Sequence, residues 1–168
     1  PGLSASFAPS FRSGTALSAV LQQAGVNERD PAALAELDEL ALPLIRRSIV
    51  GEIADFPTDP LDWPKTLSAI DPAAQWAEAL EGIGSLGAAR LARLERVAGK
   101  AARVMVSGGW AAGRAARKVK EQMSSTVLFP ETAEAGARGA ALIAGVAAGT
   151  FANIGAVPAP TYSYGDSK

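Results

Sequence analysis

Apolar residues recur every three or four positions in several stretches of the chain, and this spacing predicts amphipathic helices. The first stretch covers residues 13–25 and is expected to end at Gly25. Two more helices are expected to begin at Asp30-Pro31 and Asp71-Pro72, because Asp is a good N-cap and Pro suits the first helical position. The helix from Asp71 continues to Gly99. The apolar face of the helix from Asp30 is expected at Leu34, Leu37, Leu40, Ala41 and Leu44.

A different pattern follows Gly99. Residues 103–107 and 126–129 are short apolar runs that predict strands, and residues 111–123 and 134–149 predict helices. This strand–helix–strand–helix order favours a small parallel layer flanked by helices, an α/β fold. The Pro- and Gly-rich segment 158–168 is expected to be a flexible tail.

The longest apolar run extends from Gly139 to Ala152 and consists mostly of Ala and Gly. Its length of about 14 residues is too short to span a bilayer, so a buried helix is the better interpretation. There is no signal-peptide pattern at the N-terminus. We therefore expect a soluble, cytoplasmic protein that does not enter a membrane.

Charge and rare residue types exclude several classes of function. The net charge of −1 leaves no basic excess for general nucleic-acid binding. A basic cluster is expected to be one solvated helix face: Arg114, Arg117, Lys118 and Lys120. The chain has neither Cys nor His, which excludes disulfides, thiolate or His-ligated metal sites and Ser-His nucleophilic pairs. No metal ligands are assigned.

The most informative segment is Arg103-Val-Met-Val-Ser-Gly-Gly109, a strand that runs into paired glycines before a helix. Without a Cβ, Gly108 and Gly109 would let a flat ligand lie against bare backbone. Unpaired N–H groups at the start of the following helix favour anions. The segment is therefore a candidate nucleotide-binding turn, although paired glycines also occur where they only relieve a tight bend.

Three segments together resemble a known family. Ala79-Leu-Glu-Gly-Ile83 precedes the strand and paired glycines, and the Gly/Ala-rich helix Glu134–Gly149 follows them. This order and spacing is similar to the C-terminal domain of the FGGY carbohydrate kinases, which include glycerol, xylulose, ribulose and gluconate kinases. The resemblance covers about residues 40 to 155 and is strongest from 78 to 151.

The resemblance implies the C-terminal lobe of an actin-like ATPase (ribonuclease H-like) fold, helix-rich and incomplete. It also implies that ATP lies against this lobe, with Mg²⁺ bound mainly through the phosphates. The residues expected to border the nucleotide are Gly108, Gly109, Trp110, Ala112 and Gly113. The family often has a polar residue near Gly113, and this chain has none there.

No segment matches the family's Asp-containing catalytic motif, so no catalytic residue is assigned. We expect residues 1–157 to be part of a C-terminal kinase domain. The sugar or polyol would bind on an N-terminal lobe outside this chain, and the chain alone would be inactive. The oligomeric state stays open, with a homodimer as one candidate.

An alternative from another class is an Ala-rich helical interaction or scaffold domain whose Gly-Gly turn is purely structural. The kinase hypothesis requires parallel strands at 103–107 and 126–129 and a glycine turn that faces an open cleft. A dinucleotide-binding fold is disfavoured because no G-x-G-x-x-G follows a strand.

Overall fold

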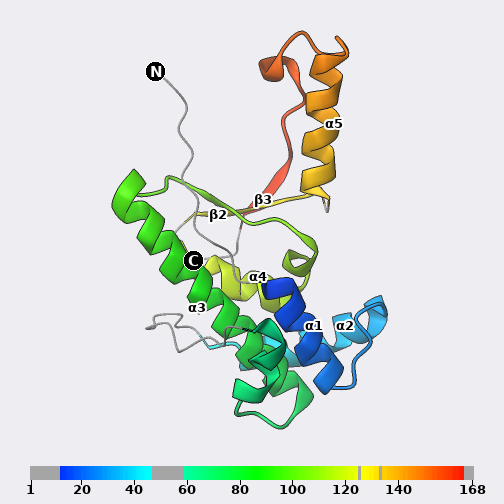
Figure 1. The fold of residues 1–168 in the computed structure, drawn as a ribbon, viewed down its shortest axis with the longest axis vertical. Coiled ribbons are helices and arrows are strands. Elements are labelled where there is room, and N and C mark those ends of the chain that lie inside the picture. The colour runs from blue at the N-terminus through cyan, green and yellow to red at the C-terminus, as the bar shows by residue number, and fades with distance from the viewer. Residues whose placement is uncertain (1–11, 47–58, 125, 133, 165–168) are drawn as a thin grey trace.

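The computed structural model describes residues 12–46, 59–124, 126–132 and 134–164. Five α-helices and three strands lie in this part of the chain, with short 3₁₀ helices between them (Figure 1). The helices are α1 (Ser13–Gln23), α2 (Pro31–Ala41), α3 (Pro72–Ala98), α4 (Arg114–Glu121) and α5 (Ala135–Ala147). The strands are β1 (Val104–Met105), β2 (Val127–Pro130) and β3 (Tyr162–Tyr164). The 3₁₀ helices are η1 (Leu42–Leu44), η2 (Pro60–Thr66), η3 (Gly109–Ala111) and η4 (Ile154–Ala156).

The predicted starts of α2 and α3 are confirmed. The Asp30 carboxylate accepts the N–H groups of Ala32 and Ala33, and Pro31 is the first helical residue. The Asp71 carboxylate accepts the N–H of Ala74 in the same way. Gly99 ends α3 with a φ of 85°, which favours glycine because a side chain would be strained there.

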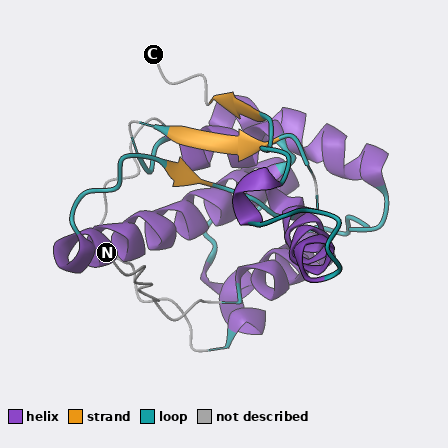
Figure 2. Cartoon of the chain, turned by 90° about the horizontal axis from the view of Figure 1, so that it is seen from above, coloured by secondary structure: helices purple, strands orange, loops and turns teal. Residues whose placement is uncertain are grey.

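The predicted parallel pair is also confirmed. β1 pairs in parallel with β2, with Val104 opposite Val127 and Met105 opposite Leu128. Parallel neighbours need a crossover connection, and α4 provides it. β3 pairs antiparallel with β2 on its other side, which makes a mixed three-stranded sheet with helices around it (Figure 2). The chain therefore has a helix-rich α/β fold with a small flanked sheet.

The core lies among α1, α2, α3 and α4. Its largest fully buried side chains are those of Leu21 and Val20 in α1 and Val119 in α4. In the sheet, the side chain of Phe129 in β2 is also fully buried. α4 is shorter than the predicted helix 111–123: residue 111 ends η3, and the helix begins at Arg114 and ends at Glu121. The glycine turn therefore leads, through η3, into a helix that packs in this core.

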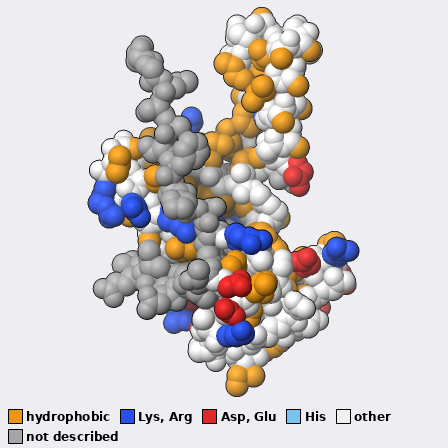
Figure 3. Space-filling view, in the orientation of Figure 1, with side chains coloured by type: hydrophobic (Ala, Val, Ile, Leu, Met, Phe, Trp, Pro, Cys, Tyr) orange, Lys and Arg blue, Asp and Glu red, His pale blue; other side chains and the backbone are white. Residues whose placement is uncertain are grey.

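The prediction that the last long helix is buried is wrong. No residue of α5 is buried, and Figure 1 shows this helix standing away from the body that α1–α4 form. The face of the projection seen in Figure 3 carries apolar side chains, whereas most charged side chains in this view lie on the body. Ala and Gly contribute little apolar area each, so their exposure costs less than that of larger side chains. Among the described residues, no helix combines the length and the apolarity that a bilayer crossing needs.

The end of the described chain also differs from expectation. Residues 162–164 lie within the segment expected to be a tail, yet they form β3 against β2. The Ser163 hydroxyl donates to the Phe129 carbonyl at 3.4 Å, and the Glu131 N–H donates to the Thr161 carbonyl at 3.1 Å. These contacts supply partners for an otherwise open sheet edge, a feature that local composition does not reveal.

Candidate functional site

The paired glycines form an open turn between β1 and η3. The Val106 N–H donates to the Leu128 carbonyl at 3.0 Å, which holds the end of β1 against β2. Gly108 then takes a φ of 112°, a conformation that favours glycine. A Cβ built on Gly108 or Gly109 would meet no atom within 4 Å. The backbone here is therefore accessible, as close approach of a ligand requires.

A cavity of about 360 Å³ lies beside this turn, between α2, η3 and the start of α4. Its volume falls in the range of about 300–1,000 Å³ that is usual for small-molecule sites. Four of the five predicted nucleotide-binding residues line it together: Gly109, Trp110, Ala112 and Gly113. Gly108 does not line this cavity; it borders two smaller ones, of about 210 and 200 Å³, on other sides of the turn.

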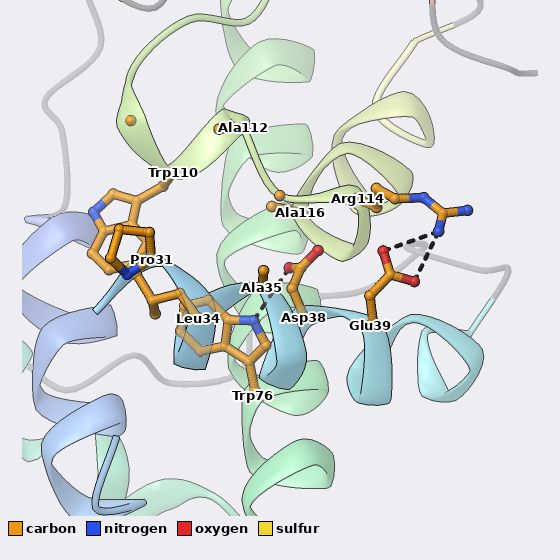
Figure 4. Close-up of a pocket in the computed structure, with 12 residues that line it drawn as sticks. Pro31, Leu34, Ala35, Asp38, Glu39, Trp76, Trp110, Ala112, Arg114 and Ala116 are labelled. Atoms are coloured by element: carbon orange, nitrogen blue, oxygen red, sulfur yellow. Dashed lines mark hydrogen bonds and ion pairs between the residues drawn. The ribbon is translucent and has the colours of Figure 1, made fainter. Parts of the chain in front are cut away.

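The opposite wall comes from α2, which the sequence analysis treated only as a packing helix. Pro31 and Leu34 line one side of the cavity near Trp110, and Asp38 lies between them and the Glu39–Arg114 pair (Figure 4). A signal for Asp38 is present in the sequence. Leu34, Leu37, Asp38 and Ala41 have the helical spacing of a buried face, so Asp38 is a charged residue on an apolar stripe. The predicted face is correspondingly wrong at Leu40 and Leu44, which are exposed.

Asp38 is buried, with 7% of its surface exposed, and it connects three helices. One carboxylate oxygen accepts the Ala115 N–H at 2.8 Å, and the other accepts the Trp76 indole N–H at 3.4 Å. The first bond satisfies one of the unpaired N–H groups at the start of α4. The anion that this helix start favours is thus a carboxylate of the protein itself, so a bound phosphate would lie elsewhere.

Gly113 is the N-cap residue of α4 and lies directly against Asp38. A Cβ on Gly113 would be 2.6 Å from the nearer carboxylate oxygen, closer than any side chain tolerates. The absence of a side chain at this position therefore has a packing reason. A polar side chain at position 113 itself would collide with Asp38.

Trp110 is both a wall of the cavity and part of the packing below it. Its ring lies 5.7 Å from that of Trp76 at an angle of 55°, a tilted arrangement that is favourable for two aromatic rings. The side chain is half-buried and packs against the hydrophobic core. Its position is thus held by packing, and one part of its surface stays available in the cavity.

The rim of the cavity carries one ion pair. An Arg114 guanidinium nitrogen donates to both carboxylate oxygens of Glu39, at 2.9 and 2.8 Å. Both side chains are more than half exposed, so the pair contributes little to stability. Arg114 is therefore a cation that can exchange Glu39 for an incoming anion at the mouth of the cavity.

The interpretation of the basic residues as one solvated helix face is wrong. Arg117, Lys118 and Lys120 are each half-buried. The guanidinium of Arg117 lies 4.7 Å from the centre of the Phe129 ring, and the Lys118 ammonium donates to the Leu42 carbonyl at 2.9 Å. Burial lowers the pKa of Lys120, because a charged ammonium is disfavoured away from water. Arg117 and Lys118 thus attach α4 to β2 and to η1.

The Gly/Ala-rich helix takes no part in the cavity. Gly145 allows the Phe151 ring to pack close, since a Cβ there would be 2.8 Å from a ring atom. Arg138 donates to the Pro158 carbonyl at 2.7 Å. These contacts lie within the projection that α5 forms with the segment after it, as Figure 1 shows.

The cavity, called the groove from here on, thus contains an open glycine turn, two tryptophans and a buried carboxylate. At its rim lies an arginine that can exchange its glutamate partner for another anion. The chain has no match among protein-family models, among curated proteins or among solved structures.

Proposed function

We propose that this chain is the nucleotide-binding part of a carbohydrate kinase of the FGGY type, with the C-terminal lobe of an actin-like ATPase fold. ATP binds with its nucleoside in the groove beside Gly109, and the complete enzyme phosphorylates a hydroxyl of a sugar or polyol. The catalytic base and the sugar-binding lobe belong to sequence outside this chain. The chain alone is inactive, and a cytoplasmic location fits the use of ATP.

One observation carries the proposal. β1, which pairs in parallel with β2, leads into a Gly-Gly turn whose backbone is open and borders a cavity of about 360 Å³. In open sheets with parallel strands, ligands bind outside the carboxyl ends of the strands. The turn at Gly108 and Gly109 follows the carboxyl end of β1, so its position supports a ligand role.

Different residues of the cavity bind different parts of the nucleotide. Trp110, Leu34 and Pro31 offer apolar surface to the nucleoside, while Gly109 allows close approach of its flat side. Arg114 at the rim attracts the phosphates, because Asp38 already occupies the start of α4. Mg²⁺ is held mainly by the phosphates in the complete enzyme. Catalysis then depends on positioning and charge stabilisation, as in other phosphoryl transfers.

Gly109→Val tests the placement of the nucleotide. The added side chain enters open space in the chain itself but occupies the surface that the nucleoside needs. We expect at least about a tenfold loss of nucleotide affinity, equivalent to about 1.4 kcal/mol, with little change in stability. Fluorescent nucleotide titration of the chain measures the loss.

Gly139→Val is the matched control, because a Cβ at Gly139 also meets nothing within 4 Å and α5 lies outside the groove. Equal affinities for the two variants would contradict the placement. The enzyme class is tested on a protein that joins this chain to an N-terminal lobe of the family. Absence of ATP turnover across a broad panel of ketoses and polyols would contradict the kinase assignment.

The alternative, an interaction or scaffold domain, is favoured by one observation, the apolar and unburied surface of α5. This surface includes Ile143, which is 64% exposed. A chain that binds no nucleotide but associates through α5 would support that alternative.

A further inference from the structure

A smaller cavity, called the strand-end cavity from here on, borders the glycine turn outside the groove and has a volume of about 200 Å³. It is lined by residues that follow both parallel strands, Val106 and Ser107 after β1 and Glu131 and Thr132 after β2. Gly108, which does not line the groove, lines this cavity. Because ligands bind outside the carboxyl ends of parallel strands, the strand-end cavity is a second place where the sheet favours a ligand.

Arg117 of α4 is the cation of this cavity, and two contacts hold its guanidinium group. The Nε–H donates to the Ala111 carbonyl at 3.2 Å, and the central carbon of the guanidinium lies 4.7 Å from the centre of the Phe129 ring. Ala111 and Phe129 also line the cavity, so the guanidinium itself lies at the cavity wall, and not only the carbon chain that carries it. The ring attracts the positive charge of the guanidinium without taking up an N–H group in a hydrogen bond to oxygen.

Most of the N–H groups of Arg117 have no acceptor. Of the five donors of a guanidinium, one is bound to Ala111 and one Nη1 donor reaches the Ser163 hydroxyl at 3.5 Å. In the part of the chain that the structure describes, Arg117 forms no ion pair, and the exposed Glu131 at the cavity is not bound to it. Arg117 is nevertheless half-buried. A partly desolvated cation without a counter-ion favours an anion in the cavity beside it.

The other donors at the cavity favour a phosphoryl group over a carboxylate. A carboxylate has two oxygens, and the guanidinium fork already engages both. A phosphoryl group has a third strong acceptor oxygen, and the hydroxyl groups of Ser107 and Thr132 line the same cavity. The cavity is smaller than the about 300–1,000 Å³ usual for drug-sized ligands, so it suits a small anion.

We propose that the strand-end cavity is a binding site for inorganic phosphate or a small phosphomonoester, with Arg117 as its anion-binding residue. The site is separate from the groove. Arg114 lines the groove and Arg117 lines the strand-end cavity, and the two cavities share only Gly109 and Ala112. The inference goes beyond the proposed function, because it does not require a nucleotide in the groove.

Titration of the 168-residue chain with inorganic phosphate, by calorimetry and by amide nuclear magnetic resonance, tests the site. We expect a dissociation constant of about 1 mM or lower, and acetate should bind at least about tenfold more weakly. The largest shifts should occur at the amides of Ser107, Gly108 and Thr132. Absence of saturable phosphate binding would overturn the proposal, and so would shifts centred on Glu39 and Arg114 in the groove.

Arg117→Gln tests the residue, and we expect it to weaken phosphate binding by at least about tenfold. Arg93→Gln is the matched control: it removes the same charge from an exposed position of α3 outside the cavity and should leave the affinity unchanged. Equal losses of affinity in these two variants would overturn the role of Arg117.

Glu131→Gln gives a test in the opposite direction. It removes a negative charge at the cavity, so phosphate should bind about two- to fivefold more tightly. The Glu131 side chain is exposed, so this variant keeps the contacts that Arg117 makes with Ala111 and Phe129. It therefore tests the site even if Arg117→Gln does not fold. Weaker phosphate binding by Glu131→Gln would contradict an anion in this cavity.

ADP distinguishes a separate phosphate site from a place for the phosphates of a nucleotide. Phosphate should bind with the same affinity in the presence and absence of saturating ADP, and competition between the two would overturn the separate site. If ADP does not bind, the proposed function fails while the phosphate titrations still test the strand-end cavity. If ADP binds and phosphate does not, only this inference fails.

Discussion

Gly113 illustrates how one missing side chain shapes the groove. A Cβ at residue 113 would lie only 2.6 Å from the nearer oxygen of the Asp38 carboxylate. Asp38 cannot retreat without losing the Ala115 N–H at the start of α4. We expect Gly113→Ala to destabilise the fold by about 1–3 kcal/mol, the usual cost of overpacking. Urea unfolding followed by tryptophan fluorescence measures this cost.

Gly109→Ala is the comparison for that prediction. Gly109 belongs to the same turn, its φ is not positive, and a Cβ there meets nothing within 4 Å. Its free energy of unfolding should stay within about 0.5 kcal/mol of the original chain. Equal losses of unfolding free energy in the two variants would mean that the contact with Asp38 does not cause the destabilisation by Gly113→Ala.

The Glu78 carboxylate helps to join helix α3 to the segment before it, beside the Gln75 side chain, which donates to the Ala69 carbonyl at 2.9 Å. Glu78 accepts the N–H groups of Ser68 and Ala69 and the Ser68 hydroxyl, each at about 3.0 Å. Burial alone would raise the pKa of Glu78, but these hydrogen bonds outweigh burial, so the net effect is a pKa below its ordinary value of 4.5. The link between the two elements therefore depends on the charged form.

The sign of the pH dependence follows from that shift. The folded pKa is lower than the unfolded pKa, so the unfolded chain binds the proton first as pH falls. The stabilisation by Glu78 is complete above the ordinary pKa of 4.5 and is lost as pH falls through the folded pKa. We expect Glu78→Gln to weaken the acid dependence of the unfolding free energy. Glu36→Gln, on the exposed side of α2, should leave more of this acid dependence in place. A greater weakening by Glu36→Gln than by Glu78→Gln would contradict the role given to Glu78.

The molecule divides into a packed helical body and a projection. Leu21 is completely buried in the body, whereas Ile143 of α5 is 64% exposed. Leu21→Ala should cost about 2–5 kcal/mol, because it removes buried apolar surface and leaves a cavity. Ile143→Ala should change the unfolding free energy by no more than about 0.5 kcal/mol.

Unfolding curves recorded by far-ultraviolet circular dichroism at several chain concentrations measure both variants. A large loss at Ile143 that grows with concentration would show that α5 is covered by another copy of the chain. That result would favour the interaction-domain alternative over an exposed α5.

Local signals in the sequence predicted much of the fold correctly. Asp30-Pro31, Asp71-Pro72 and Gly99 mark helix ends in the structure as they do in the sequence. The parallel pairing of the two strands was likewise predictable, since a strand–helix–strand order permits few other arrangements. Four of the five candidate residues line one cavity because they are consecutive or nearly so around one turn.

The exposure of α5 and the strand at the end of the described chain were not predictable in this way. An uncharged Ala/Gly run is typical of a buried helix, but burial needs close neighbours, and the described elements leave every described side chain of α5 at least partly exposed. Tyr162–Tyr164 follows a Pro-rich stretch and becomes a strand only because the edge of β2 is open to it.

The starts of α2 and α3, the end of α3 and the glycine turn follow from the chain's own residues, because caps and backbone torsions involve neighbours a few positions apart. The cavity follows from folding, since it forms where α2 meets the start of α4. Asp38 and Ala115 are 77 positions apart, and their hydrogen bond joins the two walls. Whether a carboxylate caps a distant helix depends on how the helices pack around it, which sequence spacing does not encode.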